Sequence, residues 1–455
     1  MSVRTKGITA SANILPQGIR SAHGLITGRD ITAYKLGKHL SNNVTFSIYE
    51  KSHDLGGTWL ENKYPGRSVI FTMITQGTRA GTRKFSPCYI YASSDEIHWY
   101  LKRFASVHGL DQFIHFNSKV VEAKWSETSA TWNIKIDGRT DVIQSEILIN
   151  AGGILNNPKL PSIPGFSKFT GQQLHTASWD PSVNLEGKRV AMIGAGASAV
   201  QLLPQIQPLC SHVDVYIRTP SWITAPAGIT LIDAENPNPV YSMQDKDRFA
   251  NDEDAYLETR KELEDYLCVL ALVQSVALGA FRADIKFPSN DNFRAFFKKT
   301  PEQKSLKAQF ESRMKELITD KDLQEKLIPS FEAGCRRINP GEQYLVALQK
   351  PNVRAIFDPI EEITATGVVV SGGVEHPADV LIAATGFDTT FRPRFPIIGR
   401  DGLNLQDLWH SDPTSYMGIG VAGFPNYLTF LGPNTPISNG SLMEKYYGKE
   451  FDLLM

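Results

Sequence analysis

Hydrophobic and polar positions along the first third of the chain predict strands that alternate with helices. Residues 44–50 form a β-branched and aromatic run that ends in an acid, after a helically spaced stretch at residues 31–40. Residues 97–107 are predicted to be a helix, residues 119–136 a hairpin or meander, and residues 147–151 a buried strand followed by glycine. This order is typical of the first part of an α/β domain.

A second pattern begins after a linker, residues 158–164, that contains three prolines. Residues 188–193 form an apolar strand, residues 194–205 turn through glycine into a helix, and residues 213–217 form the next strand. A strand, a helix and a strand in this order predict a right-handed βαβ unit, and therefore a doubly wound parallel sheet.

The rest of the chain predicts a helical region and then a return to strands. Residues 240–330 are rich in Glu, Lys, Leu and Ala at helical spacing, whereas residues 368–370 and 380–384 are short apolar strands. Residues 418–440 are rich in glycine and proline. A βαβ unit nested between segments of another α/β domain indicates an oxidoreductase with two dinucleotide-binding domains. We expect residues 380–384 to belong to the sheet of the outer domain, apart from the sheet of the βαβ unit.

Composition and charge exclude several classes of function. The chain has 455 residues, of which 42% are hydrophobic and 21% charged, with a formal net charge of -1. No overall field therefore recruits nucleic acid or an anionic membrane. The most apolar stretch, residues 266–281, is too short to span a bilayer. We predict a buried helix there, with contact to a membrane or a lipophilic substrate as the alternative.

The four cysteines, Cys88, Cys210, Cys268 and Cys335, are far apart and include no C-x-x-C pair. This spacing indicates neither a zinc site nor a disulfide framework, so we expect no bound metal. It fits a reducing compartment, and we expect a cytoplasmic protein. The N-terminus has basic residues but no apolar core segment, so we do not expect a secretory signal.

The turn after residues 188–193 carries the pattern Gly194-x-Gly196-x-x-Ala199 and includes Ser198. Glycines at these positions allow a tight turn from strand to helix and a close approach of backbone N–H groups to a pyrophosphate. The pattern lies after a strand, before a helix and before another strand. We therefore predict a nucleotide site, with a purely structural turn as the alternative.

The end of the following strand indicates which nucleotide is bound. Sites for NAD usually place an acid there to bind the ribose 2′-hydroxyl, whereas this chain has Arg218 and Thr219. A guanidinium suits a 2′-phosphate, so NADPH is favoured over NADH. The alternative is that Arg218 is a solvated residue at the end of a strand.

Just upstream, five residues at fixed spacing carry a family resemblance: Phe169, Gly171, His175, Trp179 and Asp180. Singly, Trp179 could be a core residue and His175 a hydrogen-bonded linker residue. Together with the adjacent glycine turn, the five resemble the fingerprint of Baeyer–Villiger monooxygenases, F-x-G-x-x-x-H-x-x-x-W followed by Pro or Asp. The resemblance covers roughly residues 31–66 and 84–445, and it is strongest to fungal-type enzymes of secondary metabolism.

Further segments are similar to those that bind FAD in this family. The resemblance implies that a strand-end acid holds the adenosine ribose and that a Gly-Thr-Trp turn lies along the flavin. The cofactor-binding positions implied in this way are Glu50, Gly57, Thr58, Trp59, Leu60, Glu61, Ile70, Tyr91 and Asp388.

The resemblance implies a monooxygenase that depends on FAD and NADPH. In the family, NADPH supplies a hydride, the flavin activates oxygen, and one oxygen atom is inserted beside a ketone carbonyl. An arginine stabilises the developing negative charge. By position this is Arg337 or its neighbour Arg336, with an ordinary salt bridge as the alternative for each.

The implied partners are oxygen and a lipophilic ketone of the secondary-metabolite kind, with hydroxylation as a second possible outcome. A hypothesis from another class is a flavin-free descendant, or the inactive product of a damaged gene. Such a protein would act as a binding scaffold or as a non-redox isomerase or cyclase. Absorbance of a bound flavin in the purified protein separates the two hypotheses.

Three places depart from the family pattern, and each concerns the flavin. Counted from the predicted first helix, the glycine positions fall at Gly24, Ile26 and Arg29, and the polar residues 17–23 predict no strand before them. Ile70 occupies the position of a family acid, and the chain stops at Met455, where the family continues. Because side chains replace glycines in the phosphate turn, we predict weak binding of FAD or none.

The predicted fold class is α/β, with two nested Rossmann-like dinucleotide-binding domains, of FAD and NADPH type, and a helical insertion. The predicted boundaries are 1–157 for the first part of the FAD-type domain, 158–235 for the first part of the NADPH-binding domain, 236–330 for the helical insertion, 331–375 for the return of the NADPH-type domain, and 376–455 for the truncated second part of the FAD-type domain.

Overall fold

The computed structural model describes most of the chain, and its described residues form two compact units. Described are residues 22–27, 34, 44–70, 91–225, 240–252, 254–255, 258–259, 299–336 and 338–435, with 22–27, 68–70, 91 and 250 described by their backbone only. The predicted helix at 31–40 (Tyr34 apart), the apolar stretch 266–281 and the candidate Arg337 lie outside these residues. Unit 1 comprises residues 1–55, 101–154 and 389–455, and unit 2 comprises residues 56–100 and 155–388.

Unit 1 is built on a parallel five-stranded sheet with the order β21-β9-β1-β2-β5. Its strands are β1 (Ala22–Thr27), β2 (Val44–Tyr49), β5 (Ile114–His115), β9 (Ile147–Asn150) and β21 (Tyr427–Thr429). Helix α4 (Ser94–Val107) places Phe104 in a core cluster with Ile48 and Ile149 on one face of this sheet. The predicted strands at 44–50 and 147–151 are confirmed.

A second, four-stranded sheet of unit 1 has the order β20-β6-β7-β8. Its strands are β6 (Val120–Ser126), β7 (Thr131–Ile136), β8 (Val142–Ser145) and β20 (Ile397–Ile398). The buried Trp132 packs with Leu148 and Tyr427 in a core that joins the two sheets. The unit also contains η1 (Asp111–Phe113), η4 (Arg400–Gly402) and α12 (Leu405–Leu408).

Strand β1 corrects the sequence prediction that no strand precedes the first glycine turn. It pairs with β2 on one side and β9 on the other, so it lies inside the sheet. The prediction was wrong because it rested on the polar residues 17–23, most of which precede the strand. The strand itself begins at Ala22. Bonding to a strand on each side stabilises a strand whose own sequence is a weak signal.

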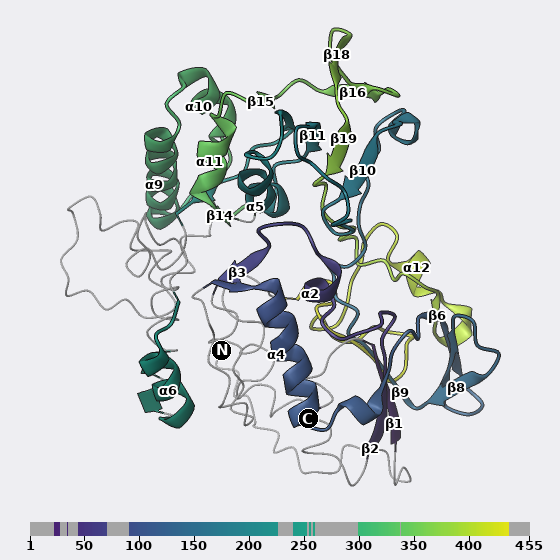
Figure 1. Cartoon of the computed structure of the whole chain (residues 1–455). Helices are drawn as coiled ribbons and strands as arrows, with labels where there is room; N and C mark the ends of the chain where they lie inside the picture. Colours follow the sequence, from purple (N-terminus) through teal and green to yellow (C-terminus); the bar gives the residue numbers. More distant parts are fainter. Residues whose placement is uncertain are drawn as a thin grey trace, which may run out of the picture. The chain divides into compact units, whose positions relative to one another are not determined.

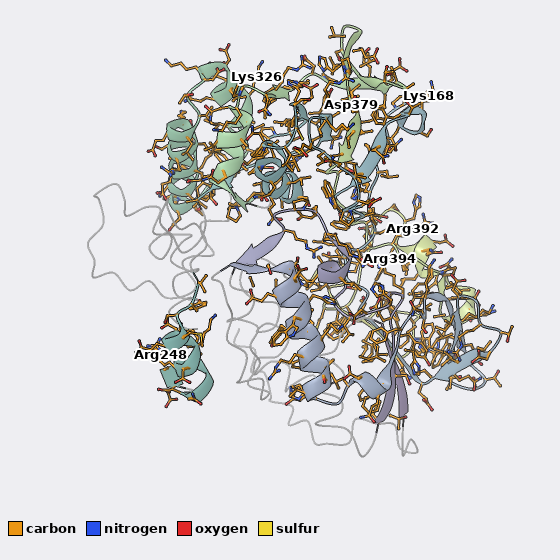
Figure 2. The ribbon with its side chains drawn as sticks, viewed as in Figure 1. Lys168, Arg248, Lys326, Asp379, Arg392 and Arg394 are labelled. Carbon is orange, nitrogen blue, oxygen red and sulfur yellow. The ribbon has the colours of Figure 1, made fainter. Side chains whose placement is uncertain are left out.

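Where β9 ends, Arg394 fixes the turn through which the chain leaves unit 1. Its Nη2 donates to the carbonyl oxygen of Gly153 at 2.9 Å, and its Nη1 lies 3.3 Å from that of Gly152 (Figure 2). Gly153 has a positive φ of 72°, a conformation that favours glycine. The turn therefore depends both on glycine and on a cation from a later segment.

Unit 2 is built on a parallel five-stranded sheet with the order β10-β19-β11-β12-β15 (Figure 1). Its strands are β10 (Gln172–His175), β11 (Arg189–Ile193), β12 (His212–Tyr216), β15 (Val353–Ile356) and β19 (Val380–Ala383). Two parallel sheets with associated helices confirm the predicted α/β class with two dinucleotide-binding domains.

The place of β19 overturns another expectation. Residues 380–384 were expected in the sheet of the first domain, but β19 pairs with both β10 and β11 in unit 2. Residues up to Asp388 therefore group with unit 2, and so do residues 56–100. A short apolar strand carries no information on which sheet it joins, because that choice depends on partners far away in the sequence.

Helices cover one face of the unit 2 sheet and a small sheet covers the other (Figure 1). The helix face is formed by α5 (Ala197–Ile206), α9 (Pro301–Leu317), α10 (Lys321–Leu327) and α11 (Glu342–Leu348). The opposite face packs against the antiparallel strands β16 (Ile360–Ile363), β17 (Gly367–Val370) and β18 (Val374–Pro377). Helices α9 and α10 fall in the predicted helical insertion.

The remaining elements of unit 2 are short. They are α2 (Thr58–Glu61), β3 (Ser68–Ile70), β4 (Tyr91–Ser93), η2 (Phe166–Lys168), β13 (Ile223–Thr224), α6 (Met243–Asn251) and β14 (Asn339–Pro340). Among the described helices, none combines the length and the apolar character that crossing a membrane requires. Within the same residues, no group of three or more His, Cys, Asp or Glu side chains is arranged to hold a metal ion.

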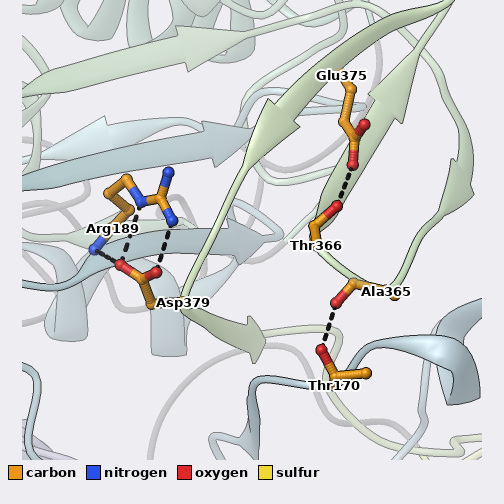
Figure 3. A network of polar contacts seen from close by, with 6 residues as sticks. All are labelled: Thr170, Arg189, Ala365, Thr366, Glu375 and Asp379. Atoms are coloured by element: carbon orange, nitrogen blue, oxygen red, sulfur yellow. Dashed lines mark hydrogen bonds and ion pairs between the residues drawn. The ribbon is translucent and has the colours of Figure 1, made fainter.

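An ion pair joins β11 to the start of β19. Asp379 accepts from the Arg189 side chain at 2.7 and 3.2 Å and from the Arg189 backbone N–H at 2.9 Å (Figure 3). Beside it, Thr170 donates to the carbonyl oxygen of Ala365, which ties the small sheet to the segment before β10. The donors on Asp379 lower the pKa of its carboxyl to about 2.

Replacing Asp379 with Asn is expected to lower the free energy of unfolding near neutral pH by about 1 kcal/mol or less, because both side chains are partly exposed. A carboxyl with a depressed pKa stabilises the folded state above its unfolded pKa of about 3.9. This contribution is lost as the pH falls through that value towards about 2. Denaturant unfolding at several pH values measures it. A difference between Asp379→Asn and the unmodified chain that stays constant down to the lowest pH would contradict the assignment.

Candidate functional site

The turn between β11 and α5 contains two glycines with different surroundings. Gly194 has a φ of 123°, and a Cβ there would lie 2.4 Å from the carbonyl oxygen of Ala384. Among the described residues, no atom lies within 4 Å of a Cβ built on Gly196. Gly194 is therefore required by the packing of the protein itself, whereas the absence of a side chain at Gly196 leaves space beside the backbone for a ligand.

The N-terminus of α5 has donors to offer in that space. Gly196 is the N-cap residue and supplies no side-chain cap, and the first helical bond runs from Val200 N–H to the Gly196 carbonyl oxygen at 3.0 Å. No acceptor for the amides of residues 197–199, which include Ser198 and the buried Ala199, occurs in the described part of the chain. Free amides and the helix dipole make this end a site for an anion such as a pyrophosphate.

Ser221, which the sequence analysis did not identify, forms a hydrogen bond to the same turn. Its hydroxyl donates to the carbonyl oxygen of Ala195 at 2.9 Å. The Ser221 hydroxyl and the Ala384 carbonyl oxygen reach the turn from segments distant in the sequence, so no local motif marks either residue. The Thr-Gly pair after Ala384 was the nearest available signal.

Arg218 and Thr219 follow the end of β12, next to the β11 turn in the sheet. Arg218 is exposed, and none of the described residues pairs with it, whereas Thr219 is half-buried. Ile193 is the last residue of β11 before the turn, and it pairs with Tyr216 on β12. Arg218 therefore lies two residues beyond this pair, at the same end of the sheet as the turn. An unpaired guanidinium at this position is available to an anionic group on a nucleotide ribose.

The five fingerprint residues all have structural partners. Phe169 and Trp179 are buried in core clusters, and a Cβ at Gly171 would lie 2.4 Å from the carbonyl oxygen of Asp379. Asp180 is exposed and accepts from the hydroxyl and the N–H of Ser182, which lowers the pKa of its carboxyl. The structure thus gives Trp179 the core position that was its alternative interpretation.

His175 lies at the end of β10, close to Thr385. Its Nδ1 accepts from the N–H of Ala177 at 3.0 Å, and its Nε2 is 3.4 Å from the hydroxyl of Thr385. Burial lowers the pKa of the imidazole, so the neutral form is favoured. The arrangement is that of a hydrogen-bonded linker histidine.

The positions that resemble a flavin site are distributed over both units. In unit 1, Glu50 follows β2, and its carboxylate accepts from the N–H of Ser52 at 2.9 Å. In unit 2, Gly57 is the N-cap of α2, which contains Thr58, Trp59, the buried Leu60 and Glu61. Glu61 accepts from the Asn156 amide at 2.7 Å.

Three further candidate positions are fixed by backbone contacts in unit 2. Ile70 on β3 and Tyr91 on β4 are opposite each other in an antiparallel pair, so the structure brings these two positions together. The N–H of Asp388 donates to the carbonyl oxygen of Asn157 at 2.8 Å. These contacts locate the three residues without testing their roles.

Of the two candidate catalytic arginines, only Arg336 is described. It is exposed, and its guanidinium carbon lies 5.5 Å from the centre of the Phe331 ring. This cation–π contact leaves its donors available. Arg337 is outside the described residues, so its role stays a prediction.

Strand register corrects the count of the glycine turn in unit 1. Gly24 and Ile26 lie within β1, where Ile26 pairs with Ile48, two residues before Glu50. In unit 2, Ile193 pairs with Tyr216, two residues before Arg218, and Gly194 follows directly. The positions equivalent to Gly194 and Gly196 are therefore Thr27 and, by count along the sequence, Arg29. The register therefore places Ile26 in the strand before the turn, contrary to the sequence prediction, and by the same count residues other than glycine stand at both glycine positions.

Comparison with known proteins identifies similar monooxygenases. Residues 36–230 match the model of a family described as flavin-binding monooxygenase-like. The chain is 35% identical over 424 residues to FAD-binding monooxygenase stcW of Emericella nidulans, covering 91% of this chain and 66% of that protein. It is 36% identical over 428 residues to FAD-binding monooxygenase tazF of Aspergillus terreus, with 90% and 70% covered. A Baeyer-Villiger monooxygenase of Streptomyces coelicolor is 30% identical over 405 residues, with 88% and 70% covered.

Solved structures are similar over nearly the same extent. Cyclohexanone monooxygenase from Rhodococcus sp. Phi1 bound to NADP+ has a TM-score of 0.74 and 26% identity, covering 92% of this chain and 81% of that one. OTEMO in complex with FAD and NADP has a TM-score of 0.74 and 25% identity, with 91% and 81% covered. The chain spans about two thirds of the length of its first relatives, 66% for stcW and 63% for moxY of Dothistroma septosporum.

Proposed function

This chain belongs to the flavin-binding monooxygenase family, and from that membership we propose that it is a Baeyer–Villiger-type monooxygenase that uses FAD, NADPH and oxygen. Its proposed reaction inserts one oxygen atom beside the carbonyl of a lipophilic ketone of the secondary-metabolite kind, or hydroxylates such a substrate. The cytoplasmic location expected from the cysteine pattern stays a prediction.

One observation carries the proposal. The uncapped N-terminus of α5 lies at the end of a parallel strand, with unoccupied space over Gly196 and the exposed Arg218 at the end of the neighbouring strand. This is the arrangement in which a dinucleotide binds, with its pyrophosphate on the helix amides and its ribose at the next strand end. A guanidinium in place of an acid at that strand end favours the 2′-phosphate of NADPH.

The relatives support the choice of cofactors and substrate class. Two fungal relatives are FAD-binding monooxygenases, and one solved neighbour holds FAD together with NADP. Solved cyclohexanone monooxygenases hold a cyclic ketone, cyclohexanone, or the lactone epsilon-caprolactone. A ketone and a ring-expanded ester are the substrate and product expected of this type of reaction.

The chain's own residues would hold the nicotinamide nucleotide by charge and shape. The amides of residues 197–199 would donate to the pyrophosphate, and Arg218 would donate to the 2′-phosphate. When bound, FAD supplies the activation of oxygen with electrons taken from NADPH. Arg337, with Arg336 as the alternative, would stabilise negative charge that develops on the substrate oxygen.

The described residues fit FAD only in part. Glu50 stands at the end of β2, where an acid can accept from a ribose hydroxyl. Thr27 and Arg29 do not fit, because the equivalent positions in unit 2 are glycines. We therefore propose that this chain holds the flavin more weakly than a member of the family with an intact glycine turn.

Replacing Gly196 with Val is expected to lower the affinity for NADP+ by about ten- to a hundredfold, because a branched side chain would fill the space over the helix amides. The melting temperature is expected to stay nearly unchanged, since nothing in the described structure lies within 4 Å of a Cβ there. Titration with NADP+ and thermal unfolding measure the two effects.

Gly194→Ala is the matched control for Gly196→Val. It should destabilise unit 2 by about 1–3 kcal/mol, because its φ is strained for a side chain and its Cβ would meet Ala384. If Gly196→Val lost stability instead and kept its NADP+ affinity, the assignment of the ligand space would be wrong.

Incorporation of labelled oxygen tests the proposed reaction. The chain is incubated with excess FAD, NADPH, isotopically labelled oxygen gas and a panel of cyclic and polyketide-like ketones. The expected product is an ester or lactone that carries one labelled atom and forms only when NADPH and FAD are both present. Conversion of a ketone without uptake of label, or without need for FAD, would favour the flavin-free isomerase or cyclase hypothesis.

A further inference from the structure

Residues 56–67, here called the docked segment, are attached to unit 2 at both ends. This segment carries Gly57, Thr58 and Trp59, the positions that resemble a flavin-side turn, and it groups with unit 2 by its contacts. Near its start, a Cβ on Gly56 would lie 2.7 Å from the His98 ring of α4. A segment expected beside the flavin is thus fastened to the unit that carries the proposed nicotinamide-nucleotide site.

The strongest attachment runs from Tyr64 to helix α5. The Tyr64 hydroxyl donates to the side-chain oxygen of Gln201 at 2.7 Å, over 137 residues of sequence. Tyr64 is only 8% exposed as a residue and belongs to the same hydrophobic cluster as the inner face of α5. A buried aromatic residue with a satisfied hydroxyl fixes both the position and the direction of the segment.

Two further residues keep the segment against α5 and α4. Gly66 has a φ of 78°, and a Cβ there would lie 2.8 Å from the Gln201 carbonyl oxygen and 2.6 Å from the Gln205 side chain. The Arg67 side chain is 12% exposed and donates to Asp95 at 3.1 Å. Glycine at position 66 therefore permits a contact between the segment and the helix backbone that no other residue would allow without strain.

We expect the position of Gln201 to depend on whether an anion is bound at the start of α5. The helix begins at Ala197, so Gln201 lies one turn further along, two residues after the last amide that has no acceptor in the described chain. A first turn with free amides frays, and an anion bound to those amides stabilises it. The position of Gln201, and with it the contact to Tyr64, then becomes better defined.

We propose that Tyr64 and Gln201 are positioning residues whose hydrogen bond couples the binding of a nicotinamide dinucleotide at α5 to the docked segment. This inference rests on the proposed function, because it requires the dinucleotide to bind at α5. The consequence is that local opening of the Gly57-Thr58-Trp59 turn becomes rarer when NADPH or NADP+ is bound. Neither residue needs to touch the cofactor for this coupling.

Hydrogen exchange with and without NADP+ tests the coupling in the full chain. In the unmodified protein, NADP+ is expected to slow exchange in peptides covering residues 56–67 by about two- to tenfold, the range of one hydrogen bond. Tyr64→Phe and Gln201→Leu should each remove this slowing. By reciprocity, their NADP+ affinity should fall by no more than the same factor.

Two matched variants separate coupling from loss of packing. Tyr344→Phe removes a hydroxyl from the same core cluster, where it has no hydrogen-bond partner among the described residues, and should keep the full effect of NADP+. Gln201→Glu keeps an acceptor oxygen for Tyr64 and should restore the effect that Gln201→Leu loses. A purely structural role would make Tyr344→Phe and Tyr64→Phe behave alike.

The outcomes distinguish this inference from the proposed function. If NADP+ binds to all variants and slows exchange in residues 56–67 equally in each, the coupling is wrong while the nucleotide site stands. The same holds if NADP+ binds but leaves that exchange unchanged in the unmodified chain. If NADP+ binds neither to the unmodified chain nor to any variant, the proposed function is contradicted and the coupling with it.

Discussion

The purified chain is expected to lose FAD readily, and Thr27→Gly with Arg29→Gly should raise its FAD affinity by about a hundredfold or more. The strand register of unit 1 makes Thr27 equivalent to Gly194 of unit 2, and counting along the sequence from there makes Arg29 equivalent to Gly196. At Gly196 the space over the backbone is free because no side chain is present. A threonine and an arginine at the equivalent positions would occupy the place where amides meet a pyrophosphate, and a loss of about 3 kcal/mol there is a factor of about a hundred.

Flavin absorbance and fluorescence titration measure this effect. Thr45→Gly is the control, because it introduces a glycine into β2 at an exposed position away from the turn and should not raise FAD affinity. Glu50→Gln should weaken FAD binding in the glycine-restored protein, since it removes the charged acceptor for the ribose. Tight, stoichiometric FAD on the unmodified 455-residue chain would show that the altered turn does not impair binding.

The second large effect concerns the choice between the two nicotinamide dinucleotides. Arg218→Ala is expected to cost about 1.5–3 kcal/mol of NADPH affinity, which is roughly ten- to a hundredfold, and to leave NADH binding almost unchanged. The reason is that Arg218 is exposed, unpaired among the described residues, and placed where a ribose 2′-phosphate would lie. Equilibrium titration with each nucleotide at fixed salt concentration measures the difference.

Lys188→Ala is the matched control for this charge effect. Lys188 is exposed and directly precedes β11, so it lies at the opposite end of the same parallel strands. Removing its charge changes the net charge of unit 2 by the same amount as Arg218→Ala, without touching the proposed phosphate position. Equal losses of NADPH and NADH affinity in Arg218→Ala would show that the arginine does not bind the phosphate.

The strands with long apolar runs were predictable from the sequence. Each of these runs contains β-branched side chains and has clear ends in the sequence, and each forms a parallel strand: residues 44–50, 188–193 and 213–217. The sheet to which a strand belongs was harder to predict from the sequence. Residues 380–384 were assigned to the wrong sheet because a four-residue apolar strand pairs equally well with any parallel neighbour, and the choice is made by tertiary packing.

Strand β1 shows a second limit of sequence reasoning. The polar residues before it concealed the strand, so the glycine positions were counted from the following helix and placed at Gly24 and Ile26. Backbone pairing with β2 and β9, which no local pattern reveals, sets the true register. The error changed which residues obstruct the turn and left the expectation of weak FAD binding in place.

The candidate site was predictable where a motif acts through the backbone. The glycine pattern placed a turn between a strand and a helix, as observed, because strand, glycine and helix follow each other in the sequence. It could not distinguish Gly194, which packs against Ala384, from Gly196, which faces open space. The contact of Tyr64 with Gln201 was also hidden, since the two residues are 137 positions apart.

Anaerobic mixing of the chain with excess FAD and NADPH tests the central claim most directly. A flavoprotein monooxygenase that takes a hydride from NADPH must bleach the flavin absorbance before oxygen is admitted. We expect bleaching that requires the protein, is much slower with NADH than with NADPH, and is slowed by Arg218→Ala. Flavin that stays oxidised at saturating FAD and NADPH, while NADP+ titration still shows nucleotide binding, would contradict it.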